Sequence, residues 1–327
     1  MDRIFSQLIR EYNINAVSVK KIRGFYAINT VDGKYSLKKT ADTPSQLMFQ
    51  IQIQQKLEEA AIINFEKIYF TKDNAPCTQA EGINYILTDY IEGNEADFDK
   101  EEHIDGIIEM LANFHEYGNG GNKGLQLKAE DLRLSAKKYY DEITAIKKKL
   151  DLSKGLSGFD MLFLKNCDYY INNAKKCEEI LDAGSYLQKF DRAVRDGKLC
   201  HNLLKKENII VKNNKFWLAS FSKCSLDYYT TDLAMIIERY IKYSKNKNLS
   251  AVDIINKYSK HFPVDCDDYA IIFAALLLPA GFAKTLRAYY AKKRSWAPTS
   301  ITAKMEAIVS TKATTEEYLK PLAEIVK

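Results

Sequence analysis

The sequence predicts an α+β fold, in which a small antiparallel β lobe precedes a larger, mainly helical lobe. In the first 90 residues, short runs rich in β-branched and aromatic residues are separated by turn residues such as Asp32-Gly33, which is typical of antiparallel strands. From about residue 100, apolar residues recur every three or four positions, as on one face of a helix. We therefore expect an N-terminal lobe over residues 1–90 and a C-terminal lobe over residues 91–327.

The N-terminal lobe is expected to contain one helix and a five-stranded sheet. The helix is predicted from Thr43 to about Ala61. Thr43 can cap its first turn, Pro44 suits the first helical position, and Gln46 can reach back to the cap. The strands are predicted at residues 16–19, 25–30, 34–38, 67–70 and 84–89.

The C-terminal lobe is expected to be helical on both sides of one β-hairpin. The apolar runs Ile209–Val211 and Phe216–Leu218 flank the turn pair Asn213-Asn214, which predicts that hairpin. NGGNKG at residues 119–124 is expected to be a loop. Helices are predicted over residues 104–115, 130–150 and 157–182, before Gly197, and from Asp232 onward.

Composition argues against several classes of protein. The net charge of +5 is spread along the chain, so most lysines are expected to be solvated and no nucleic-acid partner is predicted. None of the six cysteines forms a C-x-x-C pair, which argues against a zinc site. The apolar run Tyr269–Ala283 is too short for a membrane span and is predicted to be a buried helix. We expect no membrane association and a cytosolic origin with reduced thiols.

Several short motifs resemble one branch of the kinase-like proteins. The motifs LANFH at residues 111–115, LCH at 199–201 and DLA at 232–234 have the order and spacing of the aminoglycoside-phosphotransferase and choline-kinase branch. Within that branch, nearly the full chain is similar to the CotS-like spore coat protein family, including residues 35–38 and 85–93 and the late pairs Tyr289-Tyr290 and Ser295-Trp296. The resemblance implies a two-lobe, protein-kinase-like fold.

The catalytic loop that the resemblance implies lacks its base. Phosphoryl transfer needs a group that orients the acceptor hydroxyl, carboxylates that hold Mg²⁺, and a cradle for the phosphates. The branch's loop reads H-x-D-x-x-x-x-N, and here only His201 and Asn208 match it. Leu203 stands at the Asp position, and leucine can neither accept a proton nor orient a hydroxyl. His201 is expected to be a buried structural histidine, so no catalytic residue is intact.

The position of the metal ligand is changed as well. The branch places an Asp directly after the second hairpin strand, often as D-F-D, whereas this chain has Ser220-Phe221-Ser222. Neutral hydroxyls are poor ligands for Mg²⁺, which prefers charged oxygens. Residues 208–226 contain no Asp or Glu. Asp232 is interpreted as a helix N-cap or a loop anchor, so we expect no metal site.

Lys38 lies where the resemblance places the lysine that contacts nucleotide phosphates. Its alternative interpretation is a solvated strand lysine. A kinase lysine is normally held by a glutamate of the helix, but residues 43–57 contain no carboxylate. The glutamines of the predicted helix are therefore the expected hydrogen-bonding partners of Lys38: Gln50, Gln54 or Gln55.

Three acidic positions of one site are lost while the apolar residues around them are kept, which is the pattern of a pseudokinase. From the resemblance we expect a spore coat protein, made in the mother-cell cytoplasm and then held in the coat by contacts with other coat proteins. No cofactor is expected, although the fold implies ATP and Mg²⁺. Two alternatives stay open: an active phosphotransferase in which Glu207 or Asp227 replaces the lost acids, and a sensor that binds nucleotide through Lys38 without turnover.

Overall fold

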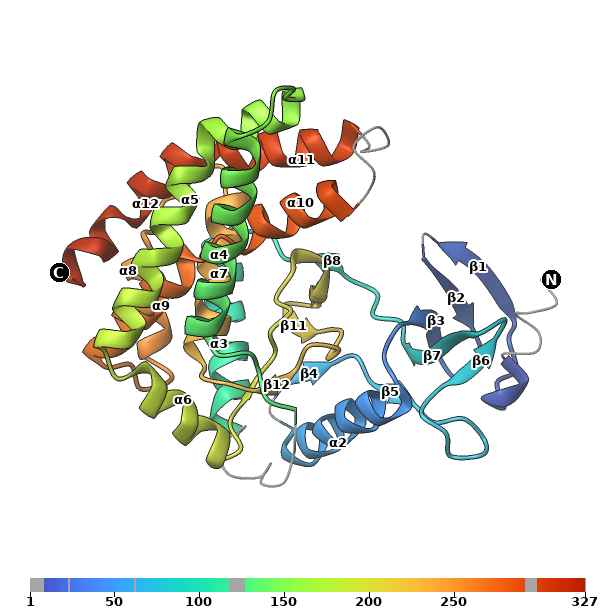
Figure 1. Cartoon of the computed structure of the whole chain (residues 1–327). Coiled ribbons are helices and arrows are strands. Elements are labelled where there is room, and N and C mark those ends of the chain that lie inside the picture. Colours follow the sequence, from blue (N-terminus) through green and yellow to red (C-terminus); the bar gives the residue numbers. More distant parts are fainter. Residues whose placement is uncertain (1–8, 23, 62, 118–126, 292–298, 327) are drawn as a thin grey trace. The chain divides into compact units, whose positions relative to one another are not determined.

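The computed structural model describes residues 9–22, 24–61, 63–117, 127–291 and 299–326. The chain forms two compact units, seen in Figure 1: unit 1 combines Met1–Leu125 with Leu199–Ser225, and unit 2 combines Gln126–Lys198 with Leu226–Lys327. This division follows packing, and the predicted lobe boundary near residue 90 stays a prediction. The predicted loop at residues 119–124 and the pair Ser295-Trp296 lie outside the described residues. The predicted α+β class is confirmed.

The N-terminal part of unit 1 folds into a six-stranded antiparallel sheet. Its strand order is β1-β2-β3-β7-β5, and β6 also pairs with β7. Leu37 and Leu87 face each other on adjacent strands and are buried with Ile28 in the core of this sheet. The strands are β1 (Ser18–Ile22), β2 (Phe25–Asn29), β3 (Lys34–Thr40), β5 (Ile68–Tyr69), β6 (Thr78–Ala80) and β7 (Ile83–Asp89).

The sheet has one strand more than the five predicted, because the sequence signal for β6 is weak. The hairpin of β6 and β7 turns at Glu81-Gly82, where both residues have positive φ, 50° and 73°. A two-residue turn of this kind is usually marked by Asn-Gly or Asp-Gly. Glutamate gives no such signal, so the strand before it was not expected.

Helix α2 (Pro44–Ala60) follows β3 as predicted. Thr43 and Gln46 form a complete capping box, in which the Gln46 amide donates to Thr43 Oγ1 and the Thr43 amide donates to Gln46 Oε1 at 2.8 Å. Leu47 and Ile51 on the buried face of the helix pack in one apolar cluster with Ile68 of β5. The helix is thereby fixed to the segment that follows it.

A second sheet, with the order β4-β11-β10-β8, joins segments far apart in the sequence. β10 (Ile209–Lys212) and β11 (Lys215–Leu218) form the predicted hairpin, and both turn residues, Asn213 and Asn214, have the positive φ of a type I′ turn. β4 (Asn64–Phe65) pairs in parallel with β11, and β8 (Asn94–Glu95) pairs with β10. Two-residue strands show no alternation, so the sequence predicted neither β4 nor β8.

Helix α3 (Glu101–Tyr117) closes the first chain segment of unit 1 and packs on this hairpin. The close approach depends on Gly106, because a Cβ atom there would lie 1.9 Å from the ring of Phe216. The remaining short elements of unit 1 are β9 (Leu199–Cys200) and the 3₁₀ turn η1 (Lys206–Asn208). β12 (Ser225–Leu226) lies where the chain passes from unit 1 to unit 2.

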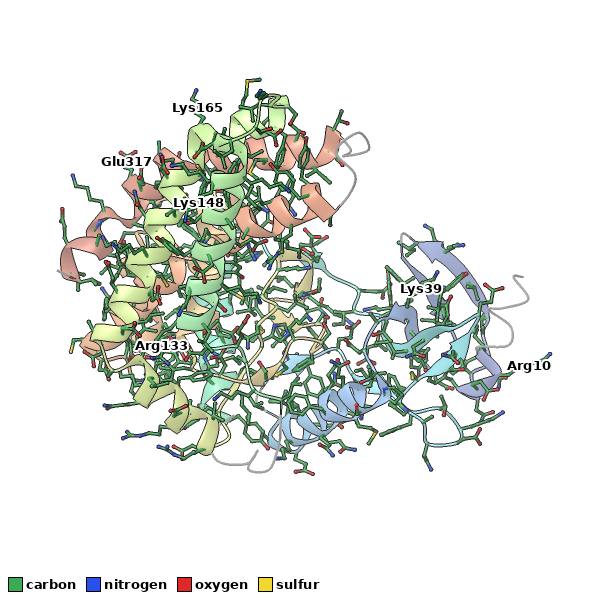
Figure 2. The ribbon with its side chains drawn as sticks, in the orientation of Figure 1. Arg10, Lys39, Arg133, Lys148, Lys165 and Glu317 are labelled. Carbon is green, nitrogen blue, oxygen red and sulfur yellow. The ribbon has the colours of Figure 1, made fainter. Side chains whose placement is uncertain are left out.

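Unit 2 is helical in its described residues. Long helices α4 and α5 run side by side (Figure 1) and enclose an apolar core that includes Ile143, Phe163 and Phe282. Exposed charged side chains such as Lys148, Lys165 and Glu317 extend from the helices into solvent, as Figure 2 shows. The helices are α4 (Leu132–Asp151), α5 (Gly158–Ala183), α6 (Tyr186–Arg195), α7 (Thr230–Tyr243), α8 (Ala251–Ser259), α9 (Cys266–Leu277), α10 (Ala280–Ala291), α11 (Thr299–Ser310) and α12 (Lys312–Ile325).

Helix α7 begins two residues earlier than predicted. Its N-cap residue is Tyr229, so the interpretation of Asp232 as an N-cap is wrong. Asp232 lies in the first turn of the helix and is fully buried. A carboxylate in this turn interacts favourably with the helix dipole, which explains why the sequence gives a helix-start signal there.

One segment of the described chain, Cys266–Ala291, is long and apolar enough to cross a membrane by length and composition alone. The segment is two helices, α9 and α10, which are separated at Leu278-Pro279. Half of its most apolar part is buried inside the fold, including Ile272 and Phe282. The apolar run predicted to be a single buried helix is thus divided between two.

Candidate functional site

The segment between β9 and β10 carries the two residues that match the kinase-like catalytic loop. His201 is fully buried, and its ring lies edge-on to the ring of Phe221 with centroids 5.4 Å apart. Asn208 Nδ2 donates a hydrogen bond to the carbonyl of Leu203 at 2.9 Å, and the Asn208 carbonyl accepts one from the Ala219 amide at 2.9 Å. Both residues therefore hold the loop in place within unit 1.

The other residues of this loop offer little for catalysis. Leu203 is half-buried, and its backbone carbonyl, rather than its side chain, makes the polar contacts, with Asn208 and with the Lys205 amide. Glu207 is exposed and lies 3.9 Å from Lys205 Nζ. Asp227, the other acid considered as a replacement, belongs to unit 2, is buried, and accepts the backbone amide of Tyr228 at 2.7 Å.

Ser220 and Ser222, the serines expected at the metal position, lie close together after β11. Their hydroxyl oxygens are 3.4 Å apart, and Ser220 has a left-handed backbone with φ of 62°. Phe221 between them is buried and packs edge-on against Phe65, with ring centroids 5.9 Å apart. The segment thus combines a buried aromatic anchor with two neutral hydroxyls. These residues do not suit Mg²⁺, which takes charged oxygen ligands.

A carboxylate does reach these serines, and it comes from the segment after α2. The parallel register of β4 and β11 pairs Phe65 with Leu218. The next residue, Glu66, donates its backbone amide to the Leu218 carbonyl at 2.9 Å. Glu66 Oε2 then accepts the backbone amide of Ser220 at 3.3 Å. The strand pairing therefore places this carboxylate beside Ser220.

The same carboxylate holds Lys38. Lys38 Nζ forms an ion pair with Glu66 Oε1, which also accepts the hydroxyl of Thr88 at 3.0 Å. The Glu66 side chain is 8% exposed, whereas the Lys38 side chain is 32% exposed. A buried carboxylate is tolerated only when charge and hydrogen bonds compensate its lost hydration, and here Lys38, Thr88 and the Ser220 amide do so.

The glutamines predicted to contact Lys38 have other partners. Gln54 Nε2 donates to the backbone carbonyl of Glu66 at 2.8 Å, and Gln54 Oε1 accepts the Ile68 amide at 2.9 Å. Gln50 donates to Asp42 at 2.9 Å, and Gln55 is exposed. Helix α2 therefore supports the lysine indirectly, because Gln54 fixes the backbone that carries the carboxylate.

Glu66 is the site residue that the sequence did not identify. The available signal was a pair of charges, Glu66-Lys67, that interrupts an otherwise largely apolar run up to Phe70. The pattern does not reveal the function of Glu66, because its position depends on pairing with a strand about 150 residues later.

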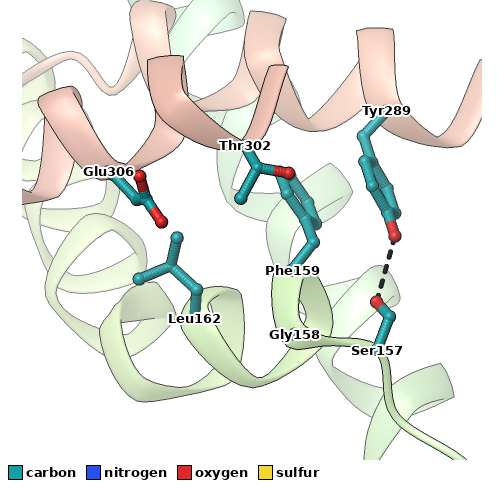
Figure 3. A pocket seen from close by; sticks show the side chains of 7 residues that line it. All are labelled: Ser157, Gly158, Phe159, Leu162, Tyr289, Thr302 and Glu306. Carbon is teal, nitrogen blue, oxygen red and sulfur yellow. Dashed lines mark hydrogen bonds between the residues drawn. The ribbon is translucent and has the colours of Figure 1, made fainter. Parts of the chain in front are cut away.

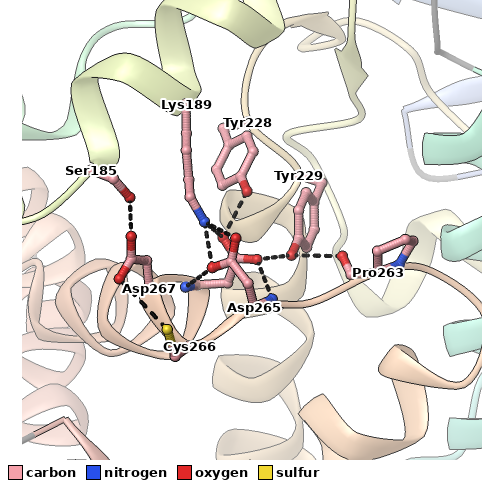
Figure 4. Close-up of polar contacts among 9 residues, drawn as sticks. Ser185, Lys189, Tyr228, Tyr229, Pro263, Asp265, Cys266 and Asp267 are labelled. Atoms are coloured by element: carbon pink, nitrogen blue, oxygen red, sulfur yellow. Dashed lines mark hydrogen bonds and ion pairs between the residues drawn. The ribbon is translucent and has the colours of Figure 1, made fainter.

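A second charged cluster lies in unit 2 (Figure 4). Asp268, which is 2% exposed, accepts hydrogen bonds from Lys189 Nζ at 2.8 Å and from the hydroxyls of Tyr228 and Tyr229, each at 2.6 Å. Figure 4 labels the three donors, Lys189, Tyr228 and Tyr229. Asp265 caps α9 and also pairs with Lys189. Burial and the neighbouring Asp268 carboxylate raise the pKa of both tyrosines, which stay protonated donors. The cluster is satisfied internally.

Unit 2 also contains a pocket of about 540 Å³ at the beginning of α5 (Figure 3). The rings of Phe159 and Tyr289 stack there at 3.7 Å, and the hydroxyls of Ser157 and Tyr289 are 3.0 Å apart. None of the predicted site residues lines this pocket. Its lining is Ser157, Gly158, Phe159, Leu162, Tyr289, Thr302 and Glu306.

Solved phosphotransferases share this fold. An aminoglycoside phosphotransferase from Alicyclobacillus acidocaldarius superimposes with a TM-score of 0.84 at 16% identity, covering 98% of this chain and 96% of that chain. A spectinomycin phosphotransferase gives 0.66 at 14% identity, covering 96% and 94%. The choline kinase LicA from Streptococcus pneumoniae gives 0.53 at 16% identity, covering 95% and 94%. These likenesses confirm the kinase-like fold that the sequence motifs implied.

Family membership agrees with the fold. A family model described as "Spore coat putative kinase YutH" matches residues 6–322, which is almost the whole chain. The match confirms the predicted relationship to the CotS-like spore coat proteins. The chain therefore belongs to the YutH family of kinase-like spore coat proteins.

Proposed function

We propose that this chain is a spore coat protein whose kinase-like site no longer transfers phosphoryl groups efficiently, and that it acts through contacts with other coat proteins. The observation that carries the proposal is the loss of all three acidic groups from one site. Leu203, Ser220 and Ser222 stand where transfer needs carboxylates, and none of them can bear a negative charge at neutral pH.

The expected effect of these replacements is large. A positioned base contributes ~10²–10⁴-fold to such a reaction. Metal ions neutralise the charge that develops on the transferred group, and the altered loop after β11 offers them only neutral oxygens. Glu66, the carboxylate beside that loop, is already engaged by Lys38, Thr88 and the Ser220 amide.

The apolar residues around the site are kept, which supports a role for the fold itself. Phe221 and His201 remain buried beside each other, and Ile209 and Leu218 are fully buried in the hairpin. A fold maintained without its acids fits a protein selected for its surface. In this proposal the chain is made in the mother-cell cytoplasm, needs no cofactor, and is then retained in the coat by protein partners.

A transfer assay tests the enzymatic half of the proposal. The chain is incubated with labelled ATP, Mg²⁺ or Mn²⁺, and acceptors that include choline, an aminoglycoside and a coat-protein extract. We expect no transfer above the background of Lys38→Ala. Metal-dependent transfer that Lys38→Ala or Glu207→Ala abolishes, and that the matched control Lys39→Ala keeps, would favour an active phosphotransferase instead.

Incorporation into the coat tests the structural half. A fluorescent fusion of the wild type and one of Lys38→Met are followed in sporulating cells. We expect both fusions to reach the coat equally, because contacts rather than chemistry retain the protein. Loss of incorporation in a Lys38→Met variant that folds normally would connect the coat role to the site.

A second candidate function is nucleotide sensing without turnover. The favouring observation is Lys38, whose ammonium group is held by Glu66 while about a third of its side chain stays exposed. Ligand binding raises thermal stability with the logarithm of ligand concentration over Kd. A thermal-shift titration with ATP, with and without Mg²⁺, therefore decides it. Absence of a shift at millimolar nucleotide rules out the sensor.

Restoring the acids gives a stricter test of what was lost. The triple variant Leu203→Asp, Ser220→Asp, Ser222→Asp should gain a Mg²⁺-dependent thermal shift with ATP that the wild type lacks. A variant that folds but still ignores nucleotide would mean that the missing acids are not the only obstacle to binding.

A further inference from the structure

The backbone of the loop after β11 needs contacts that hold it in its observed conformation. Ser220 has φ of 62°, a left-handed conformation that is unfavourable for a non-glycine residue. In a kinase, carboxylates of this loop and their metal ion fix it. Here the loop has Ser220 and Ser222, whose hydroxyl oxygens make only a weak contact at 3.4 Å, so something else must hold the backbone.

We propose that Glu66 replaces the metal ion as the tether of this loop, so that the loop keeps its position without a divalent cation. The inference rests on the proposed function, in which the site has lost its metal ligands. It assigns Glu66 a positioning role: the residue acts through the Ser220 backbone and through Lys38.

The contact itself suits a tether. Glu66 Oε2 accepts the Ser220 amide, and hydrogen bonds to a charged acceptor are stronger than neutral ones. The contact is to the backbone, so it fixes the chain whatever the side chain at position 220. The other oxygen of the carboxylate binds Lys38 and Thr88, so the two oxygens connect β3 and β7 to the loop.

The tether is itself held rigidly. The Glu66 amide donates to Leu218 at 2.9 Å, and the Glu66 carbonyl accepts Gln54 Nε2 at 2.8 Å. Gln54 is 3% exposed and also accepts the Ile68 amide. Both backbone polar groups of Glu66 are therefore hydrogen-bonded, so its backbone is fixed independently of the contact between its carboxylate and the loop.

Packing of Phe221 is the alternative anchor for the loop after β11. Its ring is buried and packs against Phe65, Phe114 and His201, so apolar contacts alone can anchor the loop. The Phe221 packing and the Glu66 contact hold different atoms of the loop. Packing of Phe221 holds a side chain, whereas Glu66 holds the amide hydrogen of Ser220, which can be observed directly by hydrogen exchange.

Hydrogen exchange of the full chain tests the inference. We compare the peptide covering residues 219–224 in the wild type, in Glu66→Gln and in the control Glu58→Gln, which loses only an exposed ion pair with Lys67. Glu66→Gln keeps the size of the side chain but leaves one acceptor oxygen instead of two. We expect the loop to exchange about tenfold faster in Glu66→Gln, as for one lost hydrogen bond to a charged group. Strands β10 and β11 and the control should exchange at wild-type rates.

A second hydrogen-exchange experiment compares the wild type in Mg²⁺ with the wild type in a chelator. We expect the same exchange in both. Three results would overturn the inference: an unchanged loop in Glu66→Gln, equal acceleration of every peptide in unit 1, or slower loop exchange in Mg²⁺. Phosphoryl transfer by the wild type would overturn the proposed function without changing the exchange result, so the two failures are distinguishable.

A milder variant covers the case in which Glu66→Gln does not fold. Thr88→Val keeps the shape of the side chain and removes the hydroxyl, which contacts Glu66 Oε1 at 3.0 Å and the Asp89 carbonyl at 3.2 Å. We expect acceleration confined to residues 219–224 and smaller than tenfold. Ser222→Ala serves as the matched control, because it removes the weak hydroxyl contact and leaves the Glu66 contact intact. Equal exchange in Thr88→Val and wild type contradicts the tether.

Discussion

Two buried carboxylates, Glu66 in unit 1 and Asp268 in unit 2, each pair with a lysine, and the two clusters differ in what they hold. In unit 2, Asp268 accepts hydrogen bonds from Lys189 and two tyrosine hydroxyls, and its side chain is almost fully buried. In unit 1, Glu66 gathers Lys38, one threonine hydroxyl and a backbone amide. Both carboxylates also accept a backbone amide: Asp268 accepts that of Asp265 at the start of α9, and Glu66 accepts that of Ser220 in the loop after β11. The first cluster therefore holds a helix start, whereas the second holds a loop.

The lysines of the two clusters also differ in exposure and in number of partners. Lys189 is 17% exposed and has two carboxylate partners, so little of its charge is left for a ligand. Lys38 is 32% exposed and has one partner. The presence of an ion pair says little about function. The exposure of the lysine, and whether the ion pair holds helices or a loop, are more informative.

The largest effect is expected from Asp268→Ala. The substitution leaves Lys189 partly buried with one fewer partner and removes the shared acceptor of Tyr228 and Tyr229. Breaking a buried charge pair on one side costs about 3–5 kcal/mol. Urea unfolding measures this loss. The control Asp267→Ala removes an exposed contact with Ser185 and should cost under about 1 kcal/mol. Equal losses in the two variants would contradict a structural role for the cluster.

A double-mutant cycle at Lys38 and Glu66 should give an intermediate effect. Lys38→Met and Glu66→Gln each remove one side of a partly buried, charge-assisted contact. We expect each to destabilise the protein by about 1–3 kcal/mol, and the double variant to lose less than the sum. The same cycle at the exposed pair Glu58 and Lys67 should show coupling of about 0–1 kcal/mol. Strict additivity at Lys38 and Glu66 would show that the pair does not stabilise unit 1.

Acid should affect the unit 2 cluster through Asp265. Partial burial raises the pKa of this carboxyl, but the hydrogen bond and charge of Lys189 outweigh burial and hold the pKa below its usual value. Because the folded-state pKa is lowered, this stabilisation is present above about pH 3.9 and is lost as the pH falls through the folded-state pKa. The side chain is mostly exposed, so the effect is under about 1 kcal/mol.

The measurement is urea unfolding between pH 7 and the acid range, compared with Asp265→Asn. The wild type should lose more stability than Asp265→Asn on acidification. Identical pH profiles would show that Lys189 does not stabilise the ionised Asp265 carboxyl.

The smallest effect is expected from Glu207→Ala. Glu207 is exposed, and its oxygen lies 3.9 Å from Lys205 Nζ. Surface substitutions of this kind change stability by about 0.5 kcal/mol or less. Thermal unfolding and the transfer assay should both match the wild type. A lost activity in this variant would make Glu207 the displaced acid of an active site.

Local sequence signals predicted the elements with strong turns and caps. Thr43 and Gln46 marked the start of α2, and Asn213-Asn214 marked the hairpin of β10 and β11. The cap and the turn depend on neighbours within a few residues, so they can be recognised from the sequence pattern. The strand before Glu81-Gly82 was not predicted, because its turn uses a residue without a turn preference.

The same physical reason limits what the sequence reveals about the candidate site. The prediction that Leu203, Ser220 and Ser222 replace acids rests on motif spacing, and it stays a prediction. The partner of Lys38 is not visible, because Glu66 reaches the site through parallel pairing of β4 with β11. A two-residue strand has no periodicity, and its register is set by tertiary contacts alone.

The pairing of β4 with β11 also has a consequence for folding. The contact from Glu66 to Ser220 joins residues 154 positions apart, and unit 1 is built from two chain segments separated by residues 126–198. Contacts of such long sequence separation form late, because a long loop must close before they contribute. During synthesis, the first segment emerges well before the hairpin that completes it. Unit 1 is therefore finished only after the first helices of unit 2 have been translated, and its unpaired strands are exposed to aggregation until then.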